Sequence, residues 1–338
     1  MGILKVRSKI GIDLGTESIR VVIKNKGIVI NEPAIIAVET LTNEVLAVGN
    51  LAKEMIGKTP EKIEALKPLS DSAIADLNAT ELIVKDIFAR LKKDFNVVRP
   101  DVLINIHVGS TELEKRAVYK LLKNVGVNRA FFVEEPIAAA LGAGIDVFSK
   151  DSFLVINIGS GSTEVASLSE GKVISSSSAR IGGEKLDLAI IEYVKRNFNV
   201  EIGKNASENI KKQIAYGKPI VKKGIEVKGR DIITGFPKQI EISSLEVYEA
   251  IKDYLREILD TVKLSMQRVP PELAVNIKKT GILLTGGSAK IRLLDEYLSD
   301  NLKINVVVAD EPIESVAKGL LMIINDEEMF KKLTNRRR

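Results

Sequence analysis

Two glycine-containing segments of this chain have the residue types that hold phosphate groups. One is Ile12–Val21, IDLGTESIRV, and the other is Ile156–Val165, INIGSGSTEV. A glycine turn lets backbone N–H groups approach an anion, because no Cβ atom stands in the way, and serine or threonine hydroxyls add further donors. Two such turns that face each other could hold the β- and γ-phosphates of a nucleotide. A carboxylate at the end of the preceding strand could hold hydrated Mg²⁺.

The two segments share one pattern, in which a tight glycine turn joins two strands. A shift of 144 residues pairs Ile12 with Ile156, Asp13 with Asn157, Gly15 with Gly159, Thr16 with Ser160, and Ser18 with Ser162. A third glycine turn, Leu283–Ser288, precedes a predicted helix at Lys290–Leu298 and could place Gly286 and Gly287 against a nucleoside and its α-phosphate. Each turn could alternatively be a plain hairpin turn, but the repetition favours phosphate binding.

The rest of the chain alternates between strand-like and helical patterns. The helical patterns cover Thr80–Lys93, Thr111–Val125 and Leu245–Val269, and Lys218–Gly235 is expected to form a β-hairpin. The strand-like runs, rich in Ile and Val, are IGIDLG, RVVIKN, DVLINIHV, FLVINIG, GILLTGG and INVVVA. This alternation predicts an α/β fold with partly parallel sheets.

Composition narrows the class of protein. A length of 338 residues suggests about two domains, and the absence of cysteine excludes disulfides and thiolate metal sites. The net charge of +5 equals the five basic residues of the last eight, KKLTNRRR, so a nucleic-acid-binding face is not expected. No signal peptide and no apolar run near 18 residues is found, so a cytoplasmic, soluble protein is expected.

Several stretches together identify the chain as similar to a known family. The glycine loops, EEPIAAALGAG (Glu134–Gly144) and TGGSAKIRLLDEYL resemble the superfamily of actin, sugar kinases and heat-shock chaperone ATPases. Others resemble MreB, the bacterial actin homologue: KGIVINEPAIIAV, MIGKTP, IADLNATE, ELEKRAV, GRDIITGFPKQIEIS and PPELAVNIKKTGILLTGG. The sequence also resembles divergent MreB paralogues of wall-less helical bacteria.

The resemblance implies an actin-like fold of two lobes, each a duplicated mixed β-sheet with flanking helices plus a smaller subdomain. The expected lobes are 1–146 completed by 313–338, with a small subdomain at about 32–70, and 147–312, with a small subdomain at about 183–243. It also implies an ATP cleft between the lobes and polymerisation into paired protofilaments that govern cell shape beneath the membrane.

Site residues carry over by position from the resemblance. Asp13 is the expected metal residue for Mg²⁺, and Glu114 and Ser162 are expected to orient the attacking water. The expected ATP/ADP contacts are Gly15, Thr16, Glu17, Gly159, Ser160, Gly161, Ser162, Thr163, Gly182, Gly183, Glu184, Lys211, Gln213, Gly286, Gly287 and Ser288.

The second loop departs from the family at Asn157, where the family has aspartate. Asparagine keeps the size and the hydrogen bonding but loses the charge and cannot take a proton. Loss of one preorganised electrostatic group often costs roughly 10²–10³ in rate, so we expect a nucleotide-binding protein with slow hydrolysis. The alternative is that Asn157 only holds the turn while another group positions the water.

The roles of Glu114, Gln213 and His107 are left open by the sequence. Thr111 and Glu114 form a T-x-x-E capping box, which alone explains that glutamate, although catalysis is also open. Gln213 stands where the family has glutamate, which leaves its ribose contact open. His107 stands where the family has proline, and a lone histidine after an apolar strand is more often structural than catalytic.

Contacts outside the nucleotide site are also expected. An anionic membrane surface could meet the loop Asp94–Pro100, through Phe95, Val97 and Val98, or the basic tail, whose Met329, Phe330 and Leu333 share a helical face. The tail could equally be a solvated terminus. Other MreB paralogues are possible partners, and the expected location is the inner face of the cell membrane.

Two other functions occur in the same superfamily. A small-molecule kinase needs a carboxylate base and a substrate pocket, usually with larger insertions, and Asn157 argues against efficient phosphoryl transfer. A chaperone ATPase would carry a substrate-binding domain after the nucleotide lobes, and little of this chain remains for one. The sequence therefore favours a filament-forming ATP-binding protein.

Overall fold

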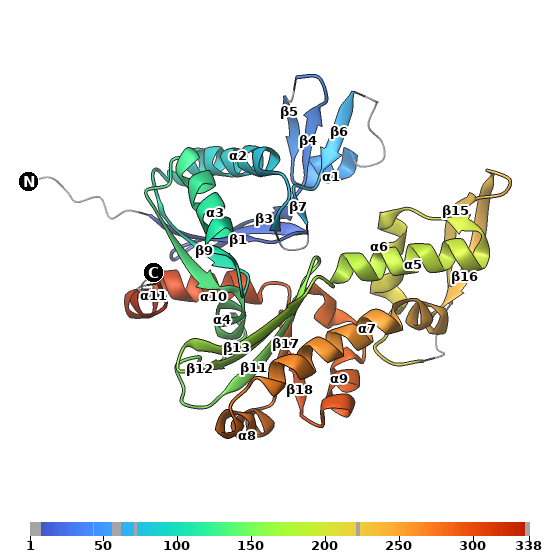
Figure 1. Cartoon of the computed structure of the whole chain (residues 1–338). Helices are drawn as coiled ribbons and strands as arrows, with labels where there is room; N and C mark the ends of the chain where they lie inside the picture. Colours follow the sequence, from blue (N-terminus) through green and yellow to red (C-terminus); the bar gives the residue numbers. More distant parts are fainter. Residues whose placement is uncertain (1–7, 43, 56–61, 71–72, 221–223, 335–338) are drawn as a thin grey trace, which may run out of the picture. The chain divides into compact units, whose positions relative to one another are not determined.

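The computed structural model describes residues 8–42, 44–55, 62–70, 73–220 and 224–334. Most of the N-terminal segment and of MIGKTP, and the last four residues of the basic tail, lie outside these ranges. The chain divides into two compact units (Figure 1). Unit 1 comprises Met1–Val147 and Glu314–Arg338, and unit 2 comprises Phe148–Ile313.

Unit 1 contains a five-stranded mixed sheet in the order β10-β9-β1-β2-β3. Strand β1 is parallel to β9, which is parallel to β10, whereas β1, β2 and β3 pair antiparallel. The strands are β1 (Lys9–Leu14), β2 (Ser18–Ile23), β3 (Gly27–Pro33), β9 (Asp101–Ile106) and β10 (Arg129–Glu134). The carboxyl ends of three parallel strands therefore meet at one edge of this sheet, beside the turn that follows β1.

Helices cover both faces of the unit 1 sheet. Ile10 and Ile12 of β1 share a core cluster with residues of α2 (Leu77–Phe95) and α3 (Glu112–Asn124). On the other face Gly11 lies against Leu320 of α10 (Ser315–Asn325), and α10 packs closely on α4 (Glu135–Gly142). The last helix, α11 (Glu327–Thr334), contacts β10 and α10.

Unit 2 repeats this topology, with a sheet in the order β13-β12-β11-β17-β18. Its strands are β11 (Phe153–Ile158), β12 (Thr163–Ser169), β13 (Lys172–Ala179), β17 (Ile282–Thr285) and β18 (Val306–Val308). Ile156 and Ile158 of β11 share a core with α5 (Gly183–Phe198), α7 (Ser244–Gln267), α8 (Pro271–Thr280) and α9 (Leu294–Leu302). The duplicated mixed sheets confirm the predicted fold class.

Each unit also carries a smaller three-stranded sheet. In unit 1 it contains β4 (Ile36–Glu39), β5 (Val45–Val48) and β6 (Ile63–Leu66), beside α1 (Asn50–Met55) and the short pair β7 (Leu69–Ser70) and β8 (Ala73–Ile74). In unit 2 it contains β14 (Val200–Glu201), β15 (Gly224–Asp231) and β16 (Pro237–Ser243), beside α6 (Lys204–Ile214).

Two predicted elements were placed wrongly. The hairpin expected within Lys218–Gly235 consists of β15 and β16, so its second strand lies beyond the predicted range. The helix expected at Lys290–Leu298 is a 3₁₀ turn, η1 (Gly287–Lys290), and α9 begins only at Leu294. Leu293 has a φ of 60°, a left-handed conformation that interrupts any helix there.

Candidate functional site

The two predicted glycine turns have the same hydrogen bond at the same place. The Gly15 N–H donates to the Ser18 carbonyl at 3.2 Å, and the Gly159 N–H donates to the Ser162 carbonyl at 2.9 Å. Each turn joins two antiparallel strands, β1 to β2 and β11 to β12. The predicted repeat of strand, tight turn and strand is confirmed. We call these elements hairpin 1 (Lys9–Ile23) and hairpin 2 (Phe153–Ser169).

Asp13, at the end of β1, is buried beside one positive charge. The Nη1 atom of Arg20, the residue directly opposite on β2, donates to its Oδ2 atom at 3.1 Å. Burial raises the pKa of Asp13 to about 6, Arg20 opposes that rise, and the charge of Glu135 adds to it. Because burial disfavours its charged form, a nearby cation would stabilise the ionised carboxylate.

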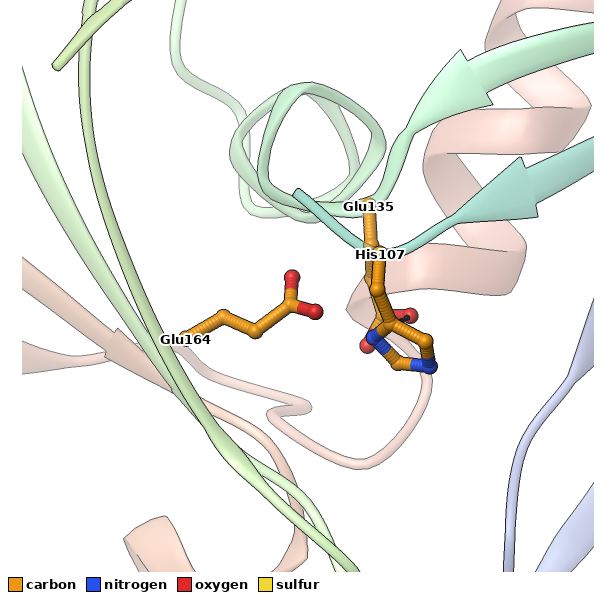
Figure 2. A group of neighbouring side chains, drawn as sticks. All are labelled: His107, Glu135 and Glu164. Atoms are coloured by element: carbon orange, nitrogen blue, oxygen red, sulfur yellow. Dashed lines mark ion pairs between the residues drawn. The ribbon is translucent and has the colours of Figure 1, made fainter. Parts of the chain in front are cut away.

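Three polar residues that the sequence patterns did not assign to the site gather beside Asp13. Asn105 of β9 accepts a hydrogen bond from the Leu14 N–H at 3.3 Å and donates to Glu135 Oε2 at 2.8 Å. His107 Nδ1 lies 3.5 Å from the same Glu135 oxygen, as Figure 2 shows. Asn105 and His107 lie at the end of β9, and Glu135 follows β10. The signal that could have found them is their place at the carboxyl ends of parallel strands.

The other predicted residues of the first loop connect it to the small sheet of unit 1. Glu17 forms ion pairs with Lys67 at 2.7 Å and with Lys53 at 3.6 Å. Thr16 is buried at the turn. Glu17 therefore fastens the turn to the segments around α1 and β6, and its carboxylate is neutralised by two lysines.

In unit 2 the structure brings together three of the predicted segments. The Gly183 N–H donates to the Gly159 carbonyl at 2.9 Å, and the Glu184 N–H donates to the Ser160 carbonyl at 3.0 Å. The Ser288 hydroxyl reaches the same Gly159 carbonyl at 3.3 Å. The second loop, the start of α5 and the third glycine turn thus form one cluster, which we call the unit 2 cluster (residues 159–163, 182–184 and 286–288, with Lys211).

Glycine is required where these segments cross. A Cβ atom on Gly182 would lie 2.4 Å from the Ser160 carbonyl oxygen. One on Gly286, whose φ is 89°, would lie 2.4 Å from the Ile158 carbonyl oxygen and 2.7 Å from Asn157 Oδ1. Gly287 has nothing within 4 Å of such an atom, so its surface is open.

Lys211, on α6, supplies a positive charge to the unit 2 cluster. Its Nζ atom donates to the Gly183 carbonyl and to Asp187 Oδ2, each at 2.7 Å. The side chain of Gln213, two residues on, is exposed, and its backbone carbonyl accepts a hydrogen bond from Arg292. Lys211 is therefore brought to the cluster, whereas the Gln213 side chain has no contact there that the structure describes.

The remaining residues of the second loop are buried at its base. Asn157 and Ser162 are 5% and 8% exposed, and Asn157 pairs across the sheet with Glu164. Thr163 is fully buried, and its hydroxyl donates to the Ile181 carbonyl at 2.7 Å. The side chain of Thr163 thus secures the loop to the segment that precedes α5.

Glu114 has the capping role that its sequence motif predicts. Its carboxylate accepts hydrogen bonds from the Thr111 N–H at 2.7 Å and the Thr111 hydroxyl at 2.9 Å, at the exposed start of α3. Capping does not exclude a catalytic role, which stays a prediction.

Most of the apolar residues expected to meet lipid are used by the fold. Val97, Phe330 and Leu333 are buried, and Phe95 packs partly against the core. Phe330 lies 4.9 Å from the Phe131 ring, measured between centroids. The amphipathic face expected on the tail exists, but it packs against the rest of unit 1. Among the described helices none is both long and apolar enough to cross a membrane.

Comparisons with known proteins agree with this architecture. Residues 7–332 match the family described as MreB/Mbl protein. The cell shape-determining protein Mbl of Bacillus cereus is 38% identical over 96% of this chain and 98% of its own length. The cell shape-determining protein MreB of Escherichia coli is 40% identical over 92% and 91%, respectively.

Solved structures show the same fold. The crystal structure of MreB5 of Spiroplasma citri bound to AMPPNP has a TM-score of 0.91 and 34% identity, and covers 97% of this chain and 98% of its own. The same protein bound to ADP matches equally well. A double helical filament of MamK has a TM-score of 0.79 at 18% identity, with 95% and 99% covered, and bears on the fold alone.

Proposed function

Because this chain belongs to the MreB/Mbl family, as a divergent MreB paralogue, we propose that it is an actin-like cytoskeletal protein that binds ATP and ADP. The observation that carries the nucleotide proposal is the unit 2 cluster, in which the predicted loop, helix start and third glycine turn meet within hydrogen-bonding distance. The crystal structures of the Spiroplasma citri relative, bound to AMPPNP and to ADP, support it.

The residues of the unit 2 cluster suit an anionic, ribose-bearing ligand. The first N–H groups of α5 donate to the Gly159 and Ser160 carbonyls, so α5 would favour an anion at the second loop through the positive end of its dipole. Lys211 adds an ammonium group beside Gly183, although Asp187 offsets part of its charge. Ser160 and Ser288 supply hydroxyls at the crossing of the segments. We assign phosphate contacts to the second loop and nucleoside contacts to Lys211 and Gly286–Ser288.

In unit 1 the residues suit a hydrated cation near the phosphates. Asp13 would hold Mg²⁺, with Gly15 and Thr16 on the phosphate side, and Mg²⁺ when bound would neutralise phosphate charge. Besides Glu114, Glu135 is a candidate for orienting a water molecule, because its carboxylate lies near Asp13 and is held by Asn105. Ser162 and Asn157 would act from the second loop.

We further propose slow hydrolysis and polymerisation into paired protofilaments. Asn157 cannot accept a proton or supply a charge, so the second loop would hold phosphate through its backbone while contributing little to turnover. The cell-shape names of the relatives support a filament protein over a small-molecule kinase. Other MreB paralogues are proposed as additional partners in the filament.

A membrane contact is proposed at the loop after α2. Val98 is 56% exposed, and its neighbours in sequence include the exposed Lys92, Lys93 and Arg99 besides the exposed Asp94, so one apolar residue and an excess of positive charge could meet anionic lipid at the inner face of the membrane. Cosedimentation with phosphatidylserine vesicles tests this contact. Val98→Asp should reduce the bound fraction, and equal binding of both proteins would contradict it.

The decisive test of the nucleotide proposal compares two adjacent lysines. Lys211→Ala removes the charge from the unit 2 cluster, whereas Lys212→Ala removes an exposed lysine that pairs with Glu208 on the same helix. We expect ATP and ADP affinity, measured by titration calorimetry, to fall about tenfold or more for Lys211→Ala. Lys212→Ala should bind like wild type. Equal affinities for all three proteins would reject this site.

A further inference from the structure

Arg20 is placed where it can control the orientation of Asp13. It lies directly opposite Asp13 in the antiparallel ladder, and residues at such positions have side chains on the same face of the sheet. The Arg20 and Asp13 side chains are 10% and 7% exposed, and 3.1 Å separates Nη1 from Oδ2. A buried, charge-assisted hydrogen bond of this kind restricts the carboxylate to one rotamer.

The pair assigns different tasks to the two carboxylate oxygens of Asp13. Oδ2 accepts from Arg20, whereas Oδ1 lies on the side of the glycine turn, 3.9 Å from where a Cβ atom of Gly15 would stand. Removal of Arg20 would leave a buried carboxylate without this donor and with freedom to rotate. The orientation of Oδ1 toward the phosphate loop thus depends on Arg20.

The repeat shows that this guanidinium is not a general requirement of the hairpin. The position equivalent to Arg20 in hairpin 2 is Glu164, and the position equivalent to Asp13 is Asn157. Both hairpins form the same turn, with and without an arginine. Arg20 therefore accompanies the carboxylate and is not needed to form the turn.

We propose that Arg20 is a positioning residue for the divalent cation that accompanies the bound nucleotide: it holds Asp13 so that Oδ1 faces the phosphate loop. This inference rests on the proposed nucleotide function. Partners that orient a metal-holding carboxylate typically change metal affinity about 10–100-fold when they are removed. Arg20 would act only through Asp13, so its effect should appear only when Mg²⁺ is present.

The test measures ADP affinity by titration calorimetry with EDTA and with excess MgCl₂, for wild type, Arg20→Leu and Arg20→Lys. The gain in affinity on adding Mg²⁺ should shrink about tenfold or more in Arg20→Leu, while its affinity in EDTA stays within about twofold of wild type. Lysine keeps the charge but not the geometry, so Arg20→Lys should recover part of the gain. Arg90→Leu, which breaks an ion pair with Glu32 in the same unit, is the matched control and should keep the whole gain.

Several results would overturn the inference. Equal losses in EDTA and in Mg²⁺ would mean a structural role alone, and an unchanged or larger gain in Arg20→Leu would mean that Arg20 does not position Asp13. If Arg20→Leu does not fold, as judged by circular dichroism, Arg20→Lys decides, and its full wild-type gain would reject the proposal. A wild type that binds no ADP in either condition would reject the proposed function itself.

Discussion

Hairpin 1 and hairpin 2 have the same hydrogen-bonded turn but different charges beside it. Both turns are closed by one N–H to carbonyl bond at equivalent positions, and both first strands lie between an antiparallel and a parallel neighbour. Hairpin 1 has an aspartate opposite an arginine, and hairpin 2 has an asparagine opposite a glutamate. The backbone that could hold phosphate is thus independent of the charged side chains that surround it.

The difference suggests a division of tasks between the two loops. In hairpin 1 a carboxylate and a guanidinium neutralise each other at the strand ends, next to Asn105 and Glu135. In hairpin 2 the position opposite Glu164 is neutral, so an aspartate there would place two carboxylates directly across the ladder. Like charges at such positions destabilise a sheet. We infer that Asn157 avoids this repulsion, so hairpin 2 would hold phosphate through its backbone, whereas hairpin 1 keeps the carboxylate that would hold the cation.

The largest expected effect comes from giving hairpin 2 the residue of hairpin 1. Asn157→Asp should raise the rate of phosphate release from Mg-ATP roughly tenfold or more, because it restores a charged group near the phosphates. Phosphate release is measured under conditions in which both proteins sediment as filaments.

A double variant separates the effect of Asn157→Asp on hydrolysis from its repulsion with Glu164. Asn157→Asp with Glu164→Gln removes the second carboxylate of the pair, so it should keep the faster turnover and unfold at a higher temperature than Asn157→Asp alone. If wild type and Asn157→Asp release phosphate at the same appreciable rate, Asn157 does not slow hydrolysis, and Glu135 or Ser162 must position the water.

A second prediction compares the contacts that each hairpin receives from the strand parallel to it. In hairpin 2 the neighbour β17 leads into Gly286, where a Cβ atom would meet two oxygens and the positive φ adds strain. In hairpin 1 the neighbour β9 supplies the Asn105 side chain, which accepts from the Leu14 N–H and donates to Glu135. Gly286→Ala should lower the free energy of unfolding by about 3 kcal/mol, and Asn105→Ala by about 2 kcal/mol.

Urea denaturation followed by circular dichroism measures both losses in that pair of variants. Gly287→Ala is the control, since nothing lies near a Cβ atom at that position. A Gly286→Ala protein as stable as Gly287→Ala would mean that the third turn is not packed against hairpin 2.

The sequence predicted the features that local patterns determine. The repeat located both hairpins and their turns, and the T-x-x-E motif gave the capping role of Glu114. The pairing of Asp13 with Arg20 depends on the register of hairpin 1 about the Gly15 turn, which the repeat located without specifying the pairs. The repeat also indicated Gly159, whereas Gly182 and Gly183 were indicated only by the family resemblance.

Features that depend on contacts between distant segments could not be predicted in this way. Asn105 and Glu135 lie near Asp13 only because β9 pairs in parallel with β1 and β10 pairs in parallel with β9, which no local pattern specifies. The apolar face with Phe330 and Leu333 was recognised, but periodicity does not say whether lipid or the protein core covers it. The start of α9 depended on the left-handed conformation of Leu293, which its side chain does not favour.

The smallest expected effect concerns the open ends of the two hairpins. Lys9 and Lys24, at the open end of hairpin 1, pair with Glu327 of α11 at 2.6 Å and 3.4 Å. The equivalent positions of hairpin 2 are the apolar residues Phe153 and Leu168. The hydrogen bond from Lys9 lowers the pKa of Glu327 below its usual range. A carboxylate with a lowered pKa stabilises the folded state above its ordinary pKa, and this contribution is lost as the pH falls through the folded-state pKa.

Glu327→Gln should therefore reduce the free energy of unfolding by less than about 1 kcal/mol at pH 7, because the pair is half-exposed and screened. The difference from wild type should shrink as the pH falls below the ordinary pKa of a glutamate, about 4, and vanish below the folded-state pKa. Glu328→Gln is the matched control, because it removes an exposed glutamate from the same first turn of α11 and leaves the pairs with Lys9 and Lys24 in place. Urea denaturation at a series of pH values measures all three proteins. A Glu327→Gln deficit that persists unchanged at pH 3 would show that α11 is held to hairpin 1 by the Phe330 packing and not by this ion pair.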